Sequence, residues 1–195
     1  MRHLKTIVLV TMLLIVEQAI AQKQTSSPDS PLQKPALDAE RARLGFLVGR
    51  FATETNIPAM PSAPKGATGT GTSVITWALD SMFLLIDEQS MNSLFGQYKG
   101  HGVLGFDAQT QKFQLSMFNN FGDHPSYKGN FVGDTLVLET KVPMPGRSFD
   151  QKLVWYKDGE AVTLKVLNDF GKGFVLAVEQ KATPVASTDK ARDGE

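Results

Sequence analysis

The 195-residue chain contains no cysteine, and this absence excludes disulfide bonds, thiolate metal sites and a cysteine nucleophile. It also excludes the lipid-modified cysteine of a bacterial lipoprotein. Histidine is scarce, with three residues in the chain. Stability must therefore come from the hydrophobic core, and the chain is long enough to bury one.

Charge of one sign is also lacking, because 20 basic and 20 acidic residues give a formal net charge of zero. Lys and Arg are isolated along the chain, so we expect no nucleic-acid partner and no binding to an anionic membrane surface. No serine lies in a G-x-S-x-G motif, and Gly69-Thr70-Gly71 lies inside an expected strand rather than opening a helix. These observations argue against a nucleophile elbow and a nucleotide-phosphate site.

Long hydrophobic runs are confined to the first residues, where Thr6–Val16 is apolar and follows Arg2 and Lys5. With the small residues of Ala19-Ile20-Ala21 after it, this pattern predicts a secretory signal at residues 1–21. The alternative is an uncleaved anchor, but the run stops at Glu17, short of the roughly 20 apolar residues that span a bilayer. We predict a periplasmic or secreted protein with no membrane contact after cleavage.

Composition divides the remaining chain into three parts. Residues 22–36 are rich in Gln, Ser and Pro and predict a disordered leader, and residues 184–195 predict a similar tail. Between them, residues 37–183 are expected to form one domain. It begins with the only convincing helix, Asp38–Val48, which Asp38 can cap and which we expect to lie as a plug against the end of a sheet.

From Arg50 onward, apolar residues alternate with polar ones, and turn residues recur about every ten positions. The central unit is a hairpin over Tyr98–Phe121 with a polar connection at Asp107–Lys112. The pattern predicts ten strands, at 50–57, 67–79, 82–91, 97–106, 112–121, 126–132, 135–142, 148–157, 161–169 and 174–182. The predicted fold class is all-β, an up-and-down antiparallel barrel, because closure removes exposed sheet edges. A two-sheet sandwich is the alternative.

Two stretches resemble a known family. LGFLVGRF at Leu44–Phe51 is similar to its helix-to-strand motif L-x-x-L-x-G-x-W, and GHGVLGFD at Gly100–Asp107, followed by Lys112-Phe113, is similar to its G-x-G-x-x-G-Y-D…K-Y hairpin. The family is domain-of-unknown-function family 1579. The resemblance implies a calycin-like barrel, distantly similar to lipocalins, fatty-acid-binding proteins and haem-carrying nitrobindins, without an established activity. Phe51 replaces a Trp and Phe106 a Tyr of the pattern, and both changes remove a hydrogen-bonding group.

Candidate ligand-binding residues are the polar-tipped side chains of the expected strands: Trp77, Glu88, His101, Asn119, Tyr127 and Trp155. Glu88 shares a strand face with apolar residues, so it either enters the interior, where its pKa would rise, or points to solvent at the strand end. His101 is expected on the barrel side of its strand, and Trp155 can equally be ordinary core. His101 and His124 lack metal-ligand spacing, so neither a metal nor a cofactor is predicted.

Three functions remain open. The first is an exported barrel that binds a small apolar ligand, for which a cavity above roughly 300 Å³ would speak. The second is a structural or interaction module with a filled interior, since the chain has 12 Phe. The third is a small enzyme that uses Glu88 and His101 as acid and base.

Overall fold

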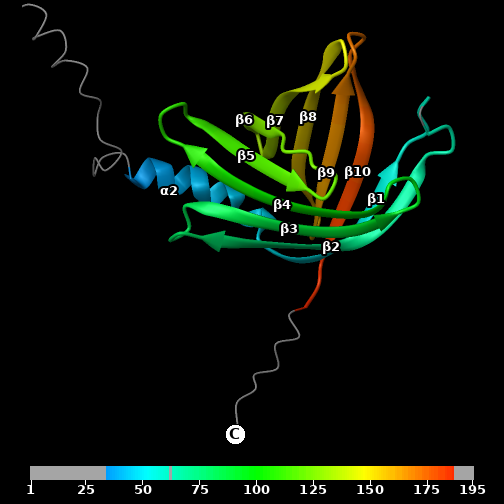
Figure 1. The fold of residues 1–195 in the computed structure, drawn as a ribbon. Helices are drawn as coiled ribbons and strands as arrows, with labels where there is room; N and C mark the ends of the chain where they lie inside the picture. Colours follow the sequence, from blue (N-terminus) through cyan, green and yellow to red (C-terminus); the bar gives the residue numbers. More distant parts are fainter. Residues whose placement is uncertain (1–33, 62, 187–195) are drawn as a thin grey trace, which may run out of the picture. The chain divides into compact units, whose positions relative to one another are not determined.

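The computed structural model describes residues 34–61 and 63–186 (Figure 1). Helix α2 (Lys34–Ala42) and the 3-10 helix η1 (Arg43–Leu47) precede ten strands. The strand bounds lie within two residues of the predicted ones. The strands are β1 (Gly49–Ile57), β2 (Ala67–Ala78), β3 (Phe83–Asn92), β4 (Gly96–Asp107), β5 (Lys112–Asn119), β6 (Ser126–Val132), β7 (Thr135–Met144), β8 (Arg147–Asp158), β9 (Ala161–Asp169) and β10 (Phe174–Pro184).

The sheet closes on itself. Each strand pairs antiparallel with its neighbours in chain order, and β1 completes the ring by pairing with β10, where Thr53 lies opposite Ala182. Closure satisfies the backbone groups that a free edge would expose. The predicted class, an all-β up-and-down antiparallel barrel of ten strands, is confirmed, and the sandwich alternative is excluded.

The predicted central hairpin is formed by β4 and β5. Asp107 holds its turn, because its carboxylate accepts hydrogen bonds from the Thr110 hydroxyl at 2.7 Å and from the Gln109 N–H at 2.8 Å. These hydrogen bonds lower the pKa of Asp107, since they stabilise the ionised carboxylate. The turns between β6 and β7 and between β8 and β9 contain glycine at positive φ, Gly133 at 59° and Gly159 at 62°.

The helical segment differs from its prediction in bounds and in type. Helix α2 begins at Lys34 rather than Asp38, and the chain tightens into the 3-10 helix η1 from Arg43. Asp38 therefore lies inside the helix instead of capping it, and its carboxylate forms an ion pair with Arg41 one turn later. The 3-10 geometry has three residues per turn, which places Leu44 and Leu47 on one face toward the barrel. Both are fully buried.

One end of the barrel is packed solid around η1. Phe113 contacts Phe131 and Phe106 edge to face, with ring centroids 5.2 and 5.0 Å apart. The Arg43 guanidinium lies 4.0 Å from the centroid of the Phe131 ring, a cation–π contact that holds η1 against β6. Leu44 belongs to the same core cluster as these rings. The predicted plug is therefore present and closes this end of the barrel.

The described part of the chain excludes most of the predicted terminal segments. By its internal contacts the chain divides into residues 1–36 and 37–195, and the barrel lies in the second unit. The predicted signal at 1–21, most of the leader and most of the tail fall outside the described residues. Within the described residues, no helix is long and apolar enough to cross a membrane.

Candidate ligand-binding site

The barrel encloses a cavity of about 310 Å³. It extends from Leu47 of η1 to Phe95 and Phe121, which lie in the β3–β4 and β5–β6 loops. These two phenylalanines are 60% and 52% exposed, so the cavity reaches the molecular surface between the loops. Its volume lies at the lower end of the range of about 300–1,000 Å³ for small-molecule sites.

The cavity exists because inward-facing side chains become smaller and more polar along the strands. Along β3, the inward residues run from Leu84 beside the packed end to Glu88, Ser90 and Asn92 toward the mouth. The β2 residues paired with them change in the same way, from Trp77 opposite Leu84 to Gly69 opposite Asn92. Most of the wall is nonetheless aliphatic or aromatic. The apolar lining includes Phe51, Ile75, Ile86, Leu115, Met117, Leu153, Trp155, Val162, Leu164, Val166 and Val178.

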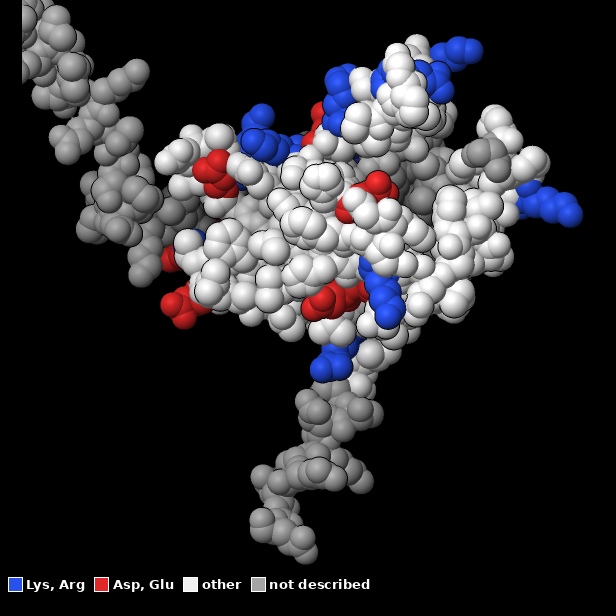
Figure 2. Space-filling model, viewed as in Figure 1, with Lys and Arg blue, Asp and Glu red and all other residues white. Residues whose placement is uncertain are grey.

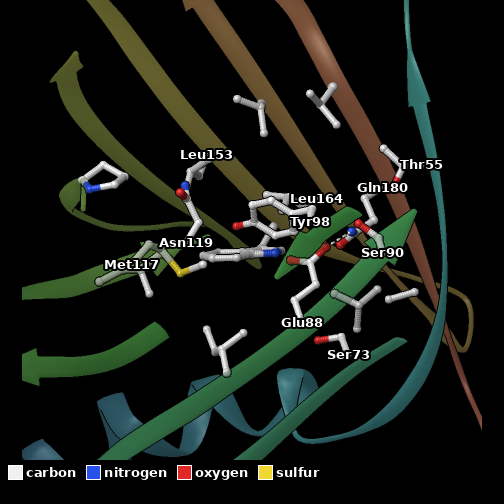
Figure 3. Close-up of a pocket in the computed structure, with 18 of the residues that line it drawn as sticks. Thr55, Ser73, Glu88, Ser90, Tyr98, Met117, Asn119, Leu153, Leu164 and Gln180 are labelled. Carbon is white, nitrogen blue, oxygen red and sulfur yellow. Dashed lines mark hydrogen bonds between the residues drawn. The ribbon is translucent and has the colours of Figure 1, made fainter. Parts of the chain in front are cut away.

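A cluster of polar side chains lies on one side of this apolar wall (Figure 3). Gln180 of β10 donates a hydrogen bond from Nε2 to Oε1 of Glu88 on β3, across the barrel interior. Ser73, Ser90 and Thr55 lie around this pair in Figure 3. The Thr55 hydroxyl is buried and has no hydrogen-bond partner among the described residues. These five residues are called the Glu88 cluster below.

Glu88 faces the interior, which settles the question that the sequence left open. Its strand neighbours Leu84 and Ile86 on the same face are buried, and Asp87 on the other face is exposed. Burial raises the pKa of Glu88 because desolvation disfavours the ionised form, and the hydrogen bond from Gln180 opposes this only in part. The cavity thus holds a carboxyl group that retains its proton to higher pH than an exposed one.

A second polar group lies across three strands. Tyr127 of β6 donates from its hydroxyl to Oε1 of Gln151 on β8 at 2.5 Å, and Gln151 Nε2 donates to Oδ1 of Asn168 on β9 at 2.9 Å. Burial raises the pKa of Tyr127 to about 12, and the charge of Asp123 adds to this. The Tyr127 hydroxyl already donates its proton to Gln151. The hydrogen bonds among Tyr127, Gln151 and Asn168 therefore mainly stabilise the wall of the barrel.

Four of the six predicted site residues line the cavity: Glu88, Asn119, Tyr127 and Trp155. Trp155 lines the cavity and also belongs to the core cluster, so its role in ligand binding stays a prediction. Asn119 also holds the β5–β6 loop, because its Oδ1 accepts the backbone N–H groups of Phe121 and Asp123. Trp77 packs against the core cluster near the closed end and does not line the cavity.

The expectation that His101 faces the barrel interior is wrong. Its Nδ1 lies 2.7 Å from Oδ1 of Asp87 on the outer surface, and the two side chains are 49% and 64% exposed. The inward positions beside it are Gly100 and Gly102, which are buried. Glycine gives no hydrophobic signal, so the alternation around His101 indicates the wrong face. Among the described residues, no three His, Asp or Glu side chains come together as a metal-binding group.

Sequence reasoning missed several residues of the site, among them Tyr98 and every member of the Glu88 cluster except Glu88 itself. Gln180 shares its strand face with Val178 and Ala182, so the period of two could have placed it inward. Tyr98 lies over Gly100: a Cβ added at Gly100 would come 2.6 Å from the Tyr98 hydroxyl oxygen. Burial, and next the charge of Glu88, raise the pKa of Tyr98.

Outside the cavity the surface carries charges of both signs. On the face drawn in Figure 2, basic and acidic side chains are scattered among uncharged ones and form no continuous track.

The fold and site define a closed ten-stranded antiparallel barrel with an internal, mostly apolar cavity that opens at one end. The family described as protein of unknown function (DUF1579) matches residues 36–164, which is more than half of the chain. The chain therefore belongs to this family, as the two sequence motifs indicated. No curated protein matches the chain.

Among solved structures, the chain is similar to a de novo designed fluorescence-activating β-barrel. The TM-score is 0.41 with 8% identity, over 72% of this chain and 95% of that one. It is also similar to EF1p2_mFAP2b bound to DFHBI, with a TM-score of 0.41 and 9% identity over 75% of this chain and 99% of that one. Likeness at this level does not bear on what this chain binds.

Proposed function

We propose that the chain is an exported binding protein that holds one small apolar molecule inside its barrel. The observation that supports this is the cavity of about 310 Å³, whose wall is mainly apolar and whose mouth opens between Phe95 and Phe121. Pockets that bind small molecules combine apolar walls with a few placed polar groups, and the Glu88 cluster supplies such groups.

The two other functions receive less support. A structural module with a filled interior does not fit, because the end of the barrel away from η1 contains a cavity. An acid–base pair of Glu88 and His101 does not fit the geometry, because Glu88 faces the cavity and His101 faces outward with Asp87. Side chains on opposite faces of one sheet cannot act on the same bound molecule.

Export is supported by the amino-terminal pattern alone, with its positive start, apolar centre and small residues before Gln22. The test is intact-mass analysis of the full chain, residues 1–195, expressed in a Gram-negative bacterium and released by osmotic shock. A processed form beginning at Gln22 in the released fraction is expected. A full-length chain that stays in the cytoplasm would contradict export.

Ligand binding is tested by filling the cavity. Ser90 points into it, and Ser90→Phe should weaken binding of 1-octanol, measured by isothermal titration calorimetry, at least tenfold. Gln89→Phe is the matched control, because Gln89 is the next residue of β3 and is exposed on the outer face. Equal affinities for both variants and the wild type, or no binding of octanol by the wild type, would overturn cavity binding.

Native mass spectrometry of protein purified from its host is an independent measurement. A carrier should retain a bound molecule of small mass, and Ser90→Phe should lose it.

A further inference from the structure

Among the residues that the structure describes, the Glu88 carboxyl has no positively charged partner. Among the described residues that line the cavity, Glu88 is the only acid, and none is Lys, Arg or His. Its cross-strand partners are Ser73 on β2 and Gly100 on β4. Gln180 reaches it from β10 with an amide, which donates a hydrogen bond but brings no charge.

An ionised Glu88 carboxylate inside the cavity would lack the partners that normally stabilise a buried charge. Taking a charge out of water is costly, and the cost is offset only when an opposite charge or several hydrogen bonds replace the water. Here the fold has already placed the carboxyl among apolar walls, and burial raises its pKa accordingly. A ligand with a positive charge would find a carboxyl that is already buried and would favour its ionised form, whereas a ligand anion would find no cation in the cavity lining.

The surroundings of Glu88 also suit an ammonium group. Ammonium carries three N–H donors and no acceptor, and the hydroxyls of Ser73, Ser90 and Thr55 can accept the hydrogens that Glu88 does not. The Thr55 hydroxyl in particular is without a partner among the described residues. The Tyr98 ring lies over Gly100, which is opposite Glu88 in the β3–β4 register, so an aromatic ring lies near the carboxyl.

We propose that the cavity selects apolar amines, with the hydrocarbon part against the aliphatic wall and the ammonium paired with Glu88. The inference rests on the proposed binding function and names its ligand class. It also excludes fatty acids and other apolar carboxylates as ligands, because the cavity lining offers their carboxylate no cation.

The test compares three molecules that share one alkyl chain. Octylamine, 1-octanol and octanoate are titrated into the processed chain at pH 7.5 by isothermal titration calorimetry. Octylamine should bind at least tenfold more tightly than octanol, and octanoate should bind most weakly. Binding of octanol without any preference for octylamine would overturn the amine proposal and leave the binding function standing. Failure of all three ligands would overturn the binding function, and the amine proposal with it.

Two variants assign the preference to Glu88. Glu88→Gln should reduce octylamine affinity at least tenfold, to the level of octanol, and change octanol affinity less than threefold. Retained octanol binding shows that the variant is folded. Asp87→Asn removes the adjacent acid on the outer face and should change neither affinity. Equal loss of octylamine binding in both variants would contradict a specific role for Glu88.

Proton release gives a readout that packing alone would not change. An ammonium beside Glu88 lowers the carboxyl pKa, so octylamine binding below the raised pKa should release protons, as measured by titration in buffers of different ionisation enthalpy. The other groups that face Glu88 are Ser73, Ser90, Thr55, Gln180 and Tyr98, of which only Tyr98 titrates, far above neutral pH. Glu88→Gln should abolish the release, and octanol should cause none. Release from Glu88→Gln of the same size as from wild type would overturn the assignment.

Discussion

At the end of the barrel beside η1, inward-facing leucines and phenylalanines fill the space between the strands. At the other end, the same strands surround a cavity lined by smaller and more polar side chains. Leu84 and Ser90 illustrate the contrast, since they lie on the same face of β3 and are six residues apart. One sheet can thus surround a packed core at one end and a cavity at the other.

The packed and hollow ends of the barrel contribute differently to the stability of the fold. Close packing of the kind around Phe113 contributes most of the free energy of folding in a small domain. The hollow end gives up such contacts and holds a desolvated acid, which lowers stability. Substitutions at the two ends should therefore have different and even opposite effects.

The largest difference is expected between two leucines beside Trp155. Leu136 is fully buried, whereas Leu164 lines the cavity. Leu136→Ala should lower the free energy of unfolding by about 3–5 kcal/mol, because it opens a new void in close packing. Leu164→Ala should cost nearer 2 kcal/mol, because one side of Leu164 already faces empty space. Urea unfolding measures both, and equal costs would contradict the division into packed and hollow ends.

Two inward glycines provide a second contrast. A Cβ at Gly129 would come 1.9 Å from the backbone oxygen of Val137, so Gly129→Ala must push β6 and β7 apart. We expect a loss of about 2–3 kcal/mol in urea unfolding. A Cβ at Gly102 meets first the Met117 sulfur, at 2.4 Å, which is part of a flexible side chain beside the cavity. Gly102→Ala should cost less than about 1 kcal/mol, and the reverse order would show that the cavity wall is rigid.

Glu88→Gln should increase stability, with an effect that grows with pH. The pKa of Glu88 is raised in the folded protein above its ordinary value of 4.5. The folded state then binds the proton more tightly than the unfolded state, so the wild type loses stability as pH rises from about 4.5 through the raised pKa. The variant lacks this loss. Urea unfolding across this pH range should show curves that meet at low pH and separate at high pH. Parallel curves would mean that Glu88 is not desolvated.

The smallest effect is expected on the outer surface. His101→Ala removes the exposed contact with Asp87 and should change the free energy of unfolding by less than about 1 kcal/mol. Octanol affinity should stay the same, because neither His101 nor Asp87 lines the cavity inside the barrel. A large loss of binding would require a connection through the sheet that the contacts of His101 do not suggest.

How far the sequence could predict this molecule depends on which residues carry a pattern. Alternation and turn glycines were enough for ten strands, because each strand has an apolar face and bounded ends. They do not reveal the inward face where that face is glycine, which is why they place His101 on the wrong side of β4. Trp77 does face inward, but alternation alone cannot distinguish the packed end of the barrel, where Trp77 lies, from the hollow end. The sequence alone cannot show whether Glu88 faces the interior, because this depends on how the sheet closes into a barrel. The Gln180–Glu88 hydrogen bond joins residues 92 positions apart, and no local pattern indicates it.

The plug that η1 forms determines how a small molecule can enter and leave the cavity. With Leu44 and Leu47 sealed into one end, a molecule in the barrel must leave by the route through which it arrived, past Phe95 and Phe121. A ligand of the kind proposed would therefore enter and leave through the same opening and would not pass through the barrel.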